Sequence, residues 1–386
     1  MIWFWLGFLA LIAGFLALDL GVFHRKAHVV SIREALIWSA VWISTSLLFS
    51  IFVYFAYANH WMGLGIGNPS STIPEVREGL DGVTAWTKYI TGYVVEWSLS
   101  VDNIFVIALI FTYFRIPRLY QHRVLFWGIM GAIVMRGIFI ALGTAIIASF
   151  HWVIYVFGVF LIFTAVKMLT SSEDPDPSRS RVLRFVYRHF PVTDKLHGSR
   201  FVVYESEIPR QEAEAASHHP EFPSPAESVE SEPEVEAAPT GHLKAGRRIL
   251  TPLMVALIIV EVTDLIFAVD SIPAIFGITK DPFLVFTSNI FAILGLRSMY
   301  FALGGLLHKF HLLKTALAMI LGLVGIKMLF GVWIEHQLGL THNQFSVISL
   351  CVILSLLVFG VIGSLLFPRK PDHEGLMTAT TAQKPE

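Results

Sequence analysis

The sequence predicts an all-α polytopic membrane protein with about nine transmembrane helices, six of which form two three-helix inverted-topology repeats. Three observations support this fold class. Of the 386 residues, 55% are hydrophobic and only 15% are charged, whereas a soluble domain has about 25% charged residues. Apolar runs recur at the length of about 20 residues that a helix needs to cross a bilayer. Two distant segments also repeat the same acidic pattern.

The composition also limits the classes of function. It excludes a cytosolic enzyme and a disordered protein, and it makes the lipid bilayer the expected environment. The net charge of −1 gives no reason to expect nucleic acid as a partner. The single cysteine, Cys351, excludes a disulfide framework within the chain and a cysteine-based zinc site.

The expected spans are helical, because an open strand in lipid would leave its backbone groups unpaired. The first apolar run has no Lys or Arg before it and no small-residue cleavage pattern after it, so we expect a span and not a removable signal peptide. The nine spans cover roughly residues 3–21, 36–58, 89–111, 124–148, 152–169, 253–275, 283–307, 316–333 and 345–367.

Basic residues follow the first, third, fifth, seventh and ninth spans. The positive-inside bias therefore predicts an N-terminus outside and a C-terminus inside, in the inner (cytoplasmic) membrane of the cell. The expected domains are two N-terminal spans (1–58), the first repeat (87–171), a cytoplasmic linker (172–250), the second repeat (251–334), a last span (345–367) and a cytoplasmic tail (368–386).

Within the linker, residues 205–241 are acidic and Pro-rich, with too little apolar surface to fold. We expect disorder there, and the sequence identifies no cytoplasmic partner for this segment. Before it lies SRVLRFVYRHF. This stretch fits a short amphipathic helix on the inner membrane surface or, as the favoured interpretation, an ordinary juxtamembrane stop signal.

The internal repeat is the most informative feature. The third span contains EWSLSVDNIF and the sixth contains DLIFAVDSIP. The equivalent pairs are Glu96 and Asp264, Asp102 and Asp270, Asn103 and Ser271, and, further along, Arg136 and Arg297. Because each unit has three spans and the linker does not cross the bilayer, the second unit enters from the opposite side. Many secondary transporters have this plan, with the substrate site at the repeat interface near the midplane.

Six carboxylates fall in predicted spans, together with two central arginines. They are Asp19, Glu96, Asp102, Glu261, Asp264 and Asp270, with Arg136 and Arg297. A carboxylate at the bilayer centre costs at least about 2.5 kcal/mol, so an excess of acids predicts bound cations or protons. No Cys or His lies centrally in a span, so the oxygen ligands suit Mn²⁺, Ca²⁺ or Mg²⁺ better than Zn²⁺ or Cu⁺.

Each candidate also has a plainer interpretation. Asp102 and Asp270 are predicted ion ligands, against structural pairing with the arginines. Glu96, Asp264 and Glu261 fit ion binding or gating, against solvation at the interface, and Asp19 is balanced between the two. Arg136 and Arg297 are counter-ions of an empty site or structural locks. Asn289 is a polar ligand or an interhelical hydrogen-bond former.

Helical periodicity adds two expectations. Glu96 and Asn103 share one face of their helix, as do Asp264 and Ser271, while Asp102 and Asp270 point about 100° away. Pro273, three residues after Asp270, predicts a kink or a local unwinding there, which would free carbonyl ligands.

These motifs together carry a family resemblance. LALDLG at Asp19, EWSLSVDNIF at Glu96, EVTDLIFAVDSIPAIFGIT from Glu261 and TSNIFAILGLRSMYF from Thr287 resemble the TerC family of bacterial membrane proteins, including its Alx branch. The resemblance implies tellurium resistance by name and, more concretely, export of manganese. It implies ion-binding roles for Asp19, Glu96, Asp102, Glu261, Asp264 and Asp270. The acidic insertion in the linker departs from the family pattern.

Three functions therefore compete. The first is export of a divalent cation, with Mn²⁺ expected, and the second is transport of Ca²⁺, protons or a cationic metabolite by the same fold. The third is an enzyme or a membrane redox or stress factor. No HExxH or GxGD motif occurs, and no span offers paired histidines or cysteines. We therefore expect a transporter that is not an enzyme and that has no cofactor besides its transported cation.

Overall fold

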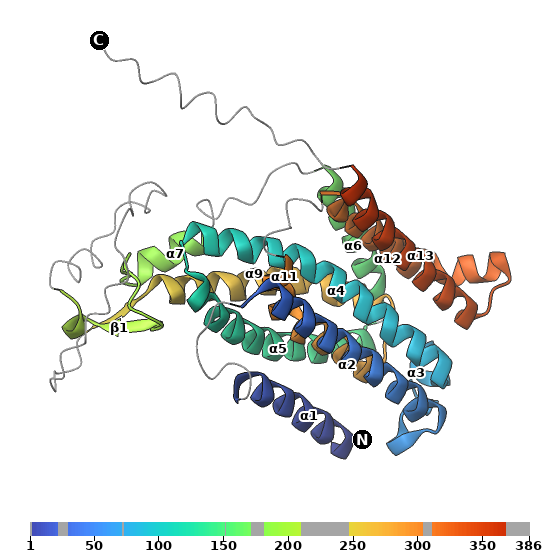
Figure 1. Cartoon of the computed structure of the whole chain (residues 1–386). Helices are drawn as coiled ribbons and strands as arrows, with labels where there is room; N and C mark the ends of the chain where they lie inside the picture. Colours follow the sequence, from blue (N-terminus) through green and yellow to red (C-terminus); the bar gives the residue numbers. More distant parts are fainter. Residues whose placement is uncertain are drawn as a thin grey trace, which may run out of the picture.

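The computed structural model describes residues 2–21, 30–71, 73–150, 152–170, 181–209, 247–303 and 311–367. In these residues the fold is all-α apart from one short antiparallel pair of strands (Figure 1). The long helices are α1 (Ile2–Gly21), α2 (Ile32–Ala58), α4 (Gly82–Tyr113), α5 (Arg118–Ser149), α6 (Val153–Thr170), α9 (Pro252–Phe276), α10 (Pro282–Leu294), α12 (His311–Leu338) and α13 (His342–Leu366). The short elements are η1 (Trp61–Gly63), α3 (Pro74–Glu78), α7 (Arg181–His189), β1 (Val202–Tyr204), η3 (Glu205–Glu207), β2 (Arg248–Leu250) and α11 (Leu296–Leu303).

Eight spans in the described part of the chain are long and apolar enough to cross a membrane, with α10 and α11 together forming one of them. They correspond to the second through ninth predicted spans. The predicted first span coincides with α1, but its apolar stretch Trp5–Ala17 is shorter than a full span. The structure therefore confirms a polytopic α-helical membrane protein with eight candidate spans in the described residues, and the first predicted span, residues 3–21, stays a prediction.

Aspartate side chains cap the N-termini of two central helices, α4 and α10. The Asp81 carboxylate accepts a hydrogen bond from the Thr84 backbone N–H at 3.0 Å at the start of α4. The Asp281 carboxylate accepts bonds from Phe283 N at 2.9 Å and Leu284 N at 3.2 Å at the start of α10. Such caps satisfy backbone donors that have no partner within the helix.

The main helix contacts join the two predicted repeat units. α4 packs against α10, α5 against α9, and α6 against α12, while α4 and α9 also contact each other. The repeat makes α4 equivalent to α9, α5 to α10 with α11, and α6 to α12, so these contacts are matched pairs. Figure 1 shows α6, α12 and α13 grouped beside the remaining helices. The inverted topology itself stays a prediction.

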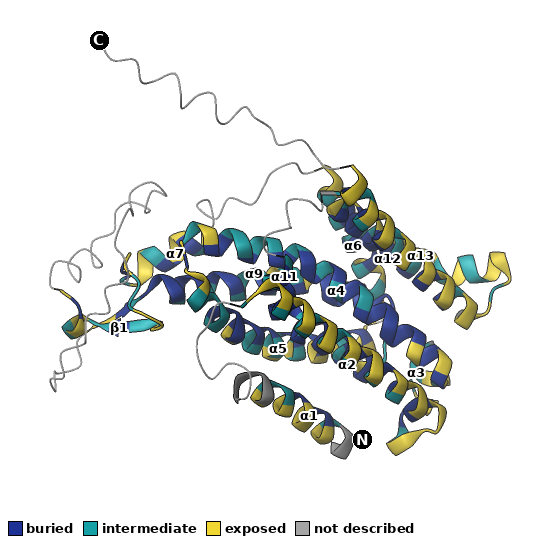
Figure 2. Cartoon of the chain, viewed as in Figure 1, coloured by how far each residue is buried: buried dark blue, intermediate teal, exposed yellow. Residues whose placement is uncertain are grey.

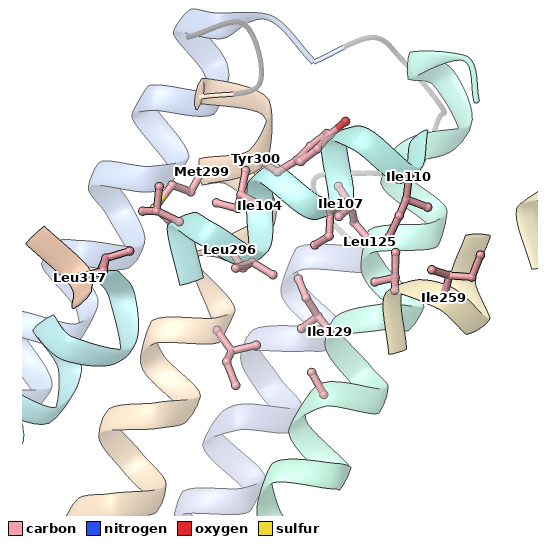
Figure 3. Close-up of a cluster of buried hydrophobic side chains, with 14 of the residues drawn as sticks. Ile104, Ile107, Ile110, Leu125, Ile129, Ile259, Leu296, Met299, Tyr300 and Leu317 are labelled. Atoms are coloured by element: carbon pink, nitrogen blue, oxygen red, sulfur yellow. The ribbon is translucent and has the colours of Figure 1, made fainter. Parts of the chain in front are cut away.

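Apolar packing holds the inner helices together. Figure 3 shows Ile104 and Ile107 of α4 beside Leu125 of α5, with Met299 and Tyr300 of α11 against them. In the α10–α11 span 89% of the most apolar window is buried, against 17% in α6. Figure 2 shows the same contrast between a buried α4 and an exposed α2. The inner helices are therefore surrounded by protein, whereas the outer ones expose apolar surface suited to lipid.

The predicted unwinding near Asp270 is absent, because α9 runs unbroken from Pro252 to Phe276 with Pro273 inside it. Pro273 lies in the last turn, where a missing donor removes one helical bond, and its carbonyl still accepts from Gly277 N at 3.0 Å. A turn at Gly295 instead separates α10 from α11. In the predicted repeat, α5 corresponds to α10 and α11 together, and α5 is one continuous helix. The two units therefore differ at this position.

The linker contains ordered structure at both ends. α7 is a short helix that buries Leu183 and Val186 and packs against α9, and its expected place on the membrane surface stays a prediction. β1 pairs antiparallel with β2, with Val203 opposite Ile249. Glu205–Glu207 forms η3, and residues 210–246, which hold most of the predicted disordered segment, lie outside the described residues. The tail from 368 onward also lies outside them.

Candidate functional site

Arg136 lies in the middle of α5, only 2% exposed, between two carboxylates from other helices. Its Nη1 contacts Oε1 of Glu96 on α4. Its Nη2 lies 3.0 Å from Oδ1 of Asp264 on α9. A charge buried at this depth is stable only when it is paired and hydrogen-bonded, and Arg136 meets both conditions.

Neutral polar side chains complete the surroundings of this ion pair. Asn289 of α10 donates through Nδ2 to Glu96 Oε2 at 3.1 Å, and its Oδ1 accepts from Arg136 at 3.2 Å. Asn103 Nδ2 donates to Asp264 Oδ1 at 3.0 Å. The Ser271 hydroxyl accepts from Arg136 Nη1 at 3.3 Å. The Arg136 cluster is defined as Glu96, Asn103, Arg136, Asp264, Ser271 and Asn289.

Helical geometry explains how four helices supply this cluster. Glu96 and Asn103 are seven residues apart on α4, and Asp264 and Ser271 are seven apart on α9. Two turns of helix return a side chain to the same face, so each pair points the same way. The structure confirms this shared face on both helices.

The formal charge of the cluster is negative, because two carboxylates face one guanidinium. A third acid lies close by. It is Glu261, one turn before Asp264 on α9, and the charge of Asp264 acts on it. Its carboxylate rests against the backbone of Gly131 on α5, where any side chain would overlap it. The region therefore holds more negative charge than Arg136 can balance.

Two buried oxygen atoms on the Glu96 face of α4 have no hydrogen-bond partner in the described part of the chain. They are Oδ1 of Asn103 and the hydroxyl of Ser100. Ser100 lies four residues after Glu96 and three before Asn103, so all three share a face. Our reading of the sequence missed Ser100. The i, i+4, i+7 spacing from Glu96 is the signal that identifies it.

The cluster offers hard oxygen donors for a cation, namely Glu96, Asp264, Asn103, Ser271 and Asn289. Within the described residues no group of three or more His, Cys, Asp or Glu side chains is arranged to hold a metal ion. The guanidinium of Arg136 instead occupies the space between the two carboxylates. In this state both carboxylates of the cluster are paired with Arg136.

Asp102 and Asp270 lie outside the Arg136 cluster. Asp270 on α9 accepts a hydrogen bond from Thr164 of α6 at 3.2 Å. Asp102 on α4 is partly buried, and the charge of Lys314 on α12 acts on it. Both aspartates thus face the third helix of the opposite repeat, as their rotation of about 100° away from the Glu96 and Asp264 faces implies. Their predicted role as ion ligands stays a prediction.

The structure leaves two predicted site residues undecided. Asp19 lies in α1, but its side chain is outside the described residues. Arg297 is buried in α11, and its role as a counter-ion stays a prediction. Of the six predicted intramembrane acids, two therefore meet at Arg136 and a third, Glu261, lies beside them.

A bundle of apolar helices with a buried ion network shared by four of them defines a multi-pass integral membrane protein. The chain belongs to the TerC family, because the model of the integral membrane protein TerC family matches residues 81–372. This match covers α4 through α13, and so it includes every residue of the Arg136 cluster.

Several membrane proteins are similar to this chain over most of its length. An uncharacterised membrane protein of Myxococcus xanthus is 43% identical over 95% of this chain and 92% of its own length. Alx of Escherichia coli K12, named as a proposed membrane-bound redox modulator, is 39% identical over 84% of this chain and 85% of its own length. An uncharacterised membrane protein of Rickettsia felis is 34% identical over 96% of this chain and 99% of its own length. No solved structure matches the chain.

Proposed function

We propose that this TerC-family protein exports a divalent cation, with Mn²⁺ as the expected cargo, by alternating access around the Arg136 cluster. The observation that carries the proposal is that a buried arginine is held by the oxygen atoms of side chains from three other helices. These oxygens are also the donors that a hard cation prefers. The guanidinium of Arg136 therefore occupies the position in which Glu96 and Asp264 would neutralise a transported cation.

Charge balance supports a dication over a monovalent cation. The carboxylates of Glu96 and Asp264 carry two negative charges, and Arg136 cancels one of them. A dication bound by both carboxylates, with the guanidinium displaced, would be balanced in full. The unpartnered Oδ1 of Asn103 offers a further ligand atom.

The helix arrangement supports alternating access. The cluster joins α4 and α5 of the first unit to α9 and α10 of the second, so it lies at the interface of the units. In transporters built from inverted repeats, the two units rock around a site at such an interface. Loss of the contacts between Arg136 and the second unit would free the units to move.

The direction of transport and the topology rest on the sequence. The distribution of basic residues supports an N-terminus outside and a C-terminus inside, with nine spans in the cytoplasmic membrane. The resemblance to the TerC family supports manganese as cargo and export as direction.

A redox function is the second candidate, because several relatives are named as proposed redox modulators. The chain has one cysteine, Cys351, which is exposed on α13. Reversible dithiol chemistry within one chain requires two cysteines. We therefore propose that the protein is not an enzyme and that any redox effect follows from the cation it moves. A Cys351→Ser variant that abolishes the redox effect while Mn²⁺ flux persists would favour the second candidate.

The test is cation flux into liposomes that contain the purified protein, with Mn²⁺, Ca²⁺, Mg²⁺ and Zn²⁺ compared. We expect Mn²⁺ flux, and we expect Asp264→Asn to abolish it. Glu78→Gln is the matched control, because Glu78 is 70% exposed in an ion pair with Arg77 far from the cluster. The absence of flux of any of these cations, with protein that is folded and inserted, would refute the proposal.

A further inference from the structure

A second buried ion pair lies away from the Arg136 cluster, at the end of the bundle where α4 and α10 begin. Nζ of Lys88 on α4 is 3.0 Å from Oε1 of Glu75 on α3, and the two side chains are only 1% and 9% exposed. Lys88 directly precedes the third predicted span, residues 89–111. The structure places it one and a half turns inside α4.

The Glu75 carboxylate connects three parts of the chain. Besides Lys88, it accepts a hydrogen bond from the Thr279 hydroxyl at 2.5 Å and from the backbone N–H of Lys280 at 3.2 Å. Thr279 and Lys280 lie in the connection from α9 to α10. The α3 lock is defined as Glu75, Lys88, Thr279 and Lys280, and it ties α3 to α4 and to the connection between α9 and α10.

Positive charge dominates the surroundings of this carboxylate. Burial alone would raise the pKa of Glu75, but Lys88 and Lys280 outweigh it and bring the pKa down to about 2. On the other side, burial lowers the pKa of Lys280. Lys327 and Glu335 of α12 also act on this group of charges. The ionised Glu75 is thus held in place by more than one ammonium group.

The α3 segment is held as a folded unit. Leu80 N bonds to Gly65 O at 3.1 Å, and Asn68 N bonds to Val76 O at 2.8 Å. Gly65 and Gly79 pack against each other with φ of +71° and +81°, which suits glycine alone. Glu75 therefore lies on a compact segment whose two ends are close together. We call this segment, residues 65–71 and 73–80, the α3 flap.

The α3 lock lies close to the starts of α4 and α10, two of the four helices that carry the Arg136 cluster. Lys88 precedes Glu96 by eight residues on α4, and Asp281, next to Lys280, precedes Asn289 by eight residues at α10. Eight residues of helix span about 12 Å. Between these levels α4 and α10 are in tight contact, because a Cβ at Gly92 would lie 2.9 Å from the Ser288 hydroxyl.

Beyond the lock, at the same end of the bundle, lies a cavity of about 270 Å³. Its lining includes Glu75, Asp281 and the flap residues Gly65 and Gly79. Glu75 therefore borders this cavity and also pairs with Lys88 on the helix that leads to the cluster.

We propose that the α3 lock is a gate that closes the pathway between the Arg136 cluster and this end of the bundle. The proposal rests on the transport function proposed above. With the lock closed, α4 and α10 are in contact between the two levels, and the Glu75–Lys88 pair holds the α3 flap against α4. Movement of the α3 flap breaks the Glu75–Lys88 pair, separates α4 from α10 and opens the cluster to the cavity.

The test measures access to Ser288, which lies between the lock and the cluster. Ser288→Cys in a Cys351→Ser background provides one reactive thiol, and a membrane-impermeant thiol reagent is applied to each side of oriented vesicles. We expect slow labelling in this parent. Glu75→Gln or Lys88→Gln should each raise the labelling rate from the α3 side about tenfold, as expected when a closed state loses part of its advantage over an open one.

Three comparisons make the result decisive. The double variant Glu75→Gln/Lys88→Gln should label no faster than either single variant, because both changes remove the same pair. Glu78→Gln on the same α3 helix should label like the parent. Unchanged labelling in both single variants, with unfolding temperatures that show folded protein, would overturn the gate.

The labelling readout does not depend on transport. Faster labelling without Mn²⁺ flux in any variant would therefore support the gate and refute the proposed function. Unchanged labelling with normal Mn²⁺ flux would refute the gate alone.

Discussion

The Arg136 cluster and the α3 lock are both buried ion networks, but their charge excess has opposite sign. In the cluster, Glu96 and Asp264 outnumber Arg136. In the lock, Lys88 and Lys280 outnumber Glu75. Both bear the desolvation cost of buried charge. The excess negative charge of the cluster suits a cation, whereas in the lock two ammonium groups hold one carboxylate in place, with the Asp281 carboxylate next to Lys280.

The two networks also differ in where the sequence encodes them. The cluster uses residues of the repeated EWSLSVDN and DLIFAVDS motifs within the spans. The lock uses a five-residue helix, α3, and the connection from α9 to α10. The proposed transport site thus lies on long helices of the bundle, whereas the proposed gate lies on a short flap between them.

The largest expected effect is that of Arg136→Gln. Loss of one partner of a buried ion pair costs about 3–5 kcal/mol, because the remaining charges are left uncompensated. We expect a large fall in the unfolding temperature of the cation-free protein and partial recovery with Mn²⁺. Arg118→Gln, at an exposed position on the same helix, is the control. Equal behaviour of the two variants would show that Arg136 is no counter-ion.

The second prediction separates the cluster from the aspartates outside it. Glu96→Gln and Asp264→Asn should reduce Mn²⁺ flux at least about tenfold more than Asp102→Asn and Asp270→Asn, a difference equivalent to about 1.4 kcal/mol. The reason is that only the first two carboxylates meet at Arg136. The measurement is initial flux in liposomes at matched protein content. The reverse order would move the cation site to Asp102 and Asp270.

The third prediction concerns the pH dependence of the lock. The pKa of Glu75 is lowered from 4.5 to about 2, so its stabilising contribution is complete above the higher value and is lost as the pH falls toward the lower one. The difference in unfolding temperature between the parent and Glu75→Gln should be constant from about pH 6 to pH 8 and should shrink on acidification.

Subtraction of the variant is necessary, because other groups at this end titrate as well. Burial raises the pKa of Asp281 and lowers that of Lys280. A difference that instead grows as the pH falls would contradict the charge assignment of the lock.

A smaller effect is expected from Gly131→Ala. The added methyl group would overlap the Glu261 carboxylate and displace it from the neighbourhood of Asp264. We expect the apparent affinity for Mn²⁺ to weaken by a few-fold, since the change removes nearby negative charge but no direct ligand. Gly137→Ala on the same helix meets only an ordinary contact with Phe286 and should be silent. Equal affinities would place Glu261 off the pathway.

The smallest effect is expected in the linker. β1 pairs with β2, and Glu205 N bonds to Arg247 O at 3.0 Å, so the chain ends that flank residues 210–246 are held together. Replacement of residues 211–243 by a short Gly/Ser turn should leave flux within about threefold, because the cost of loop closure changes slowly with length. Loss of flux in purified protein would assign the segment a direct role in transport.

Much of the fold follows from the sequence, because span length and helical periodicity are local properties. The eight observed spans match eight of those predicted, and the shared faces of α4 and α9 are as expected. The uninterrupted α9 was not foreseen, since proline chemistry alone does not say that one lost bond near a helix end is tolerated.

The sequence by itself determined that this chain crosses a membrane, that acids recur in its two units, and which of them share a helix face. Only the tertiary structure decided which acids meet an arginine, because this depends on how each helix is rotated toward its neighbours. Asp102 and Glu96 are six residues apart on one helix, yet only Glu96 contacts Arg136. Glu75 and Lys88 lie in different elements, and the fold of the α3 flap onto α4 creates their pair. Contacts between elements depend on packing that no local pattern encodes.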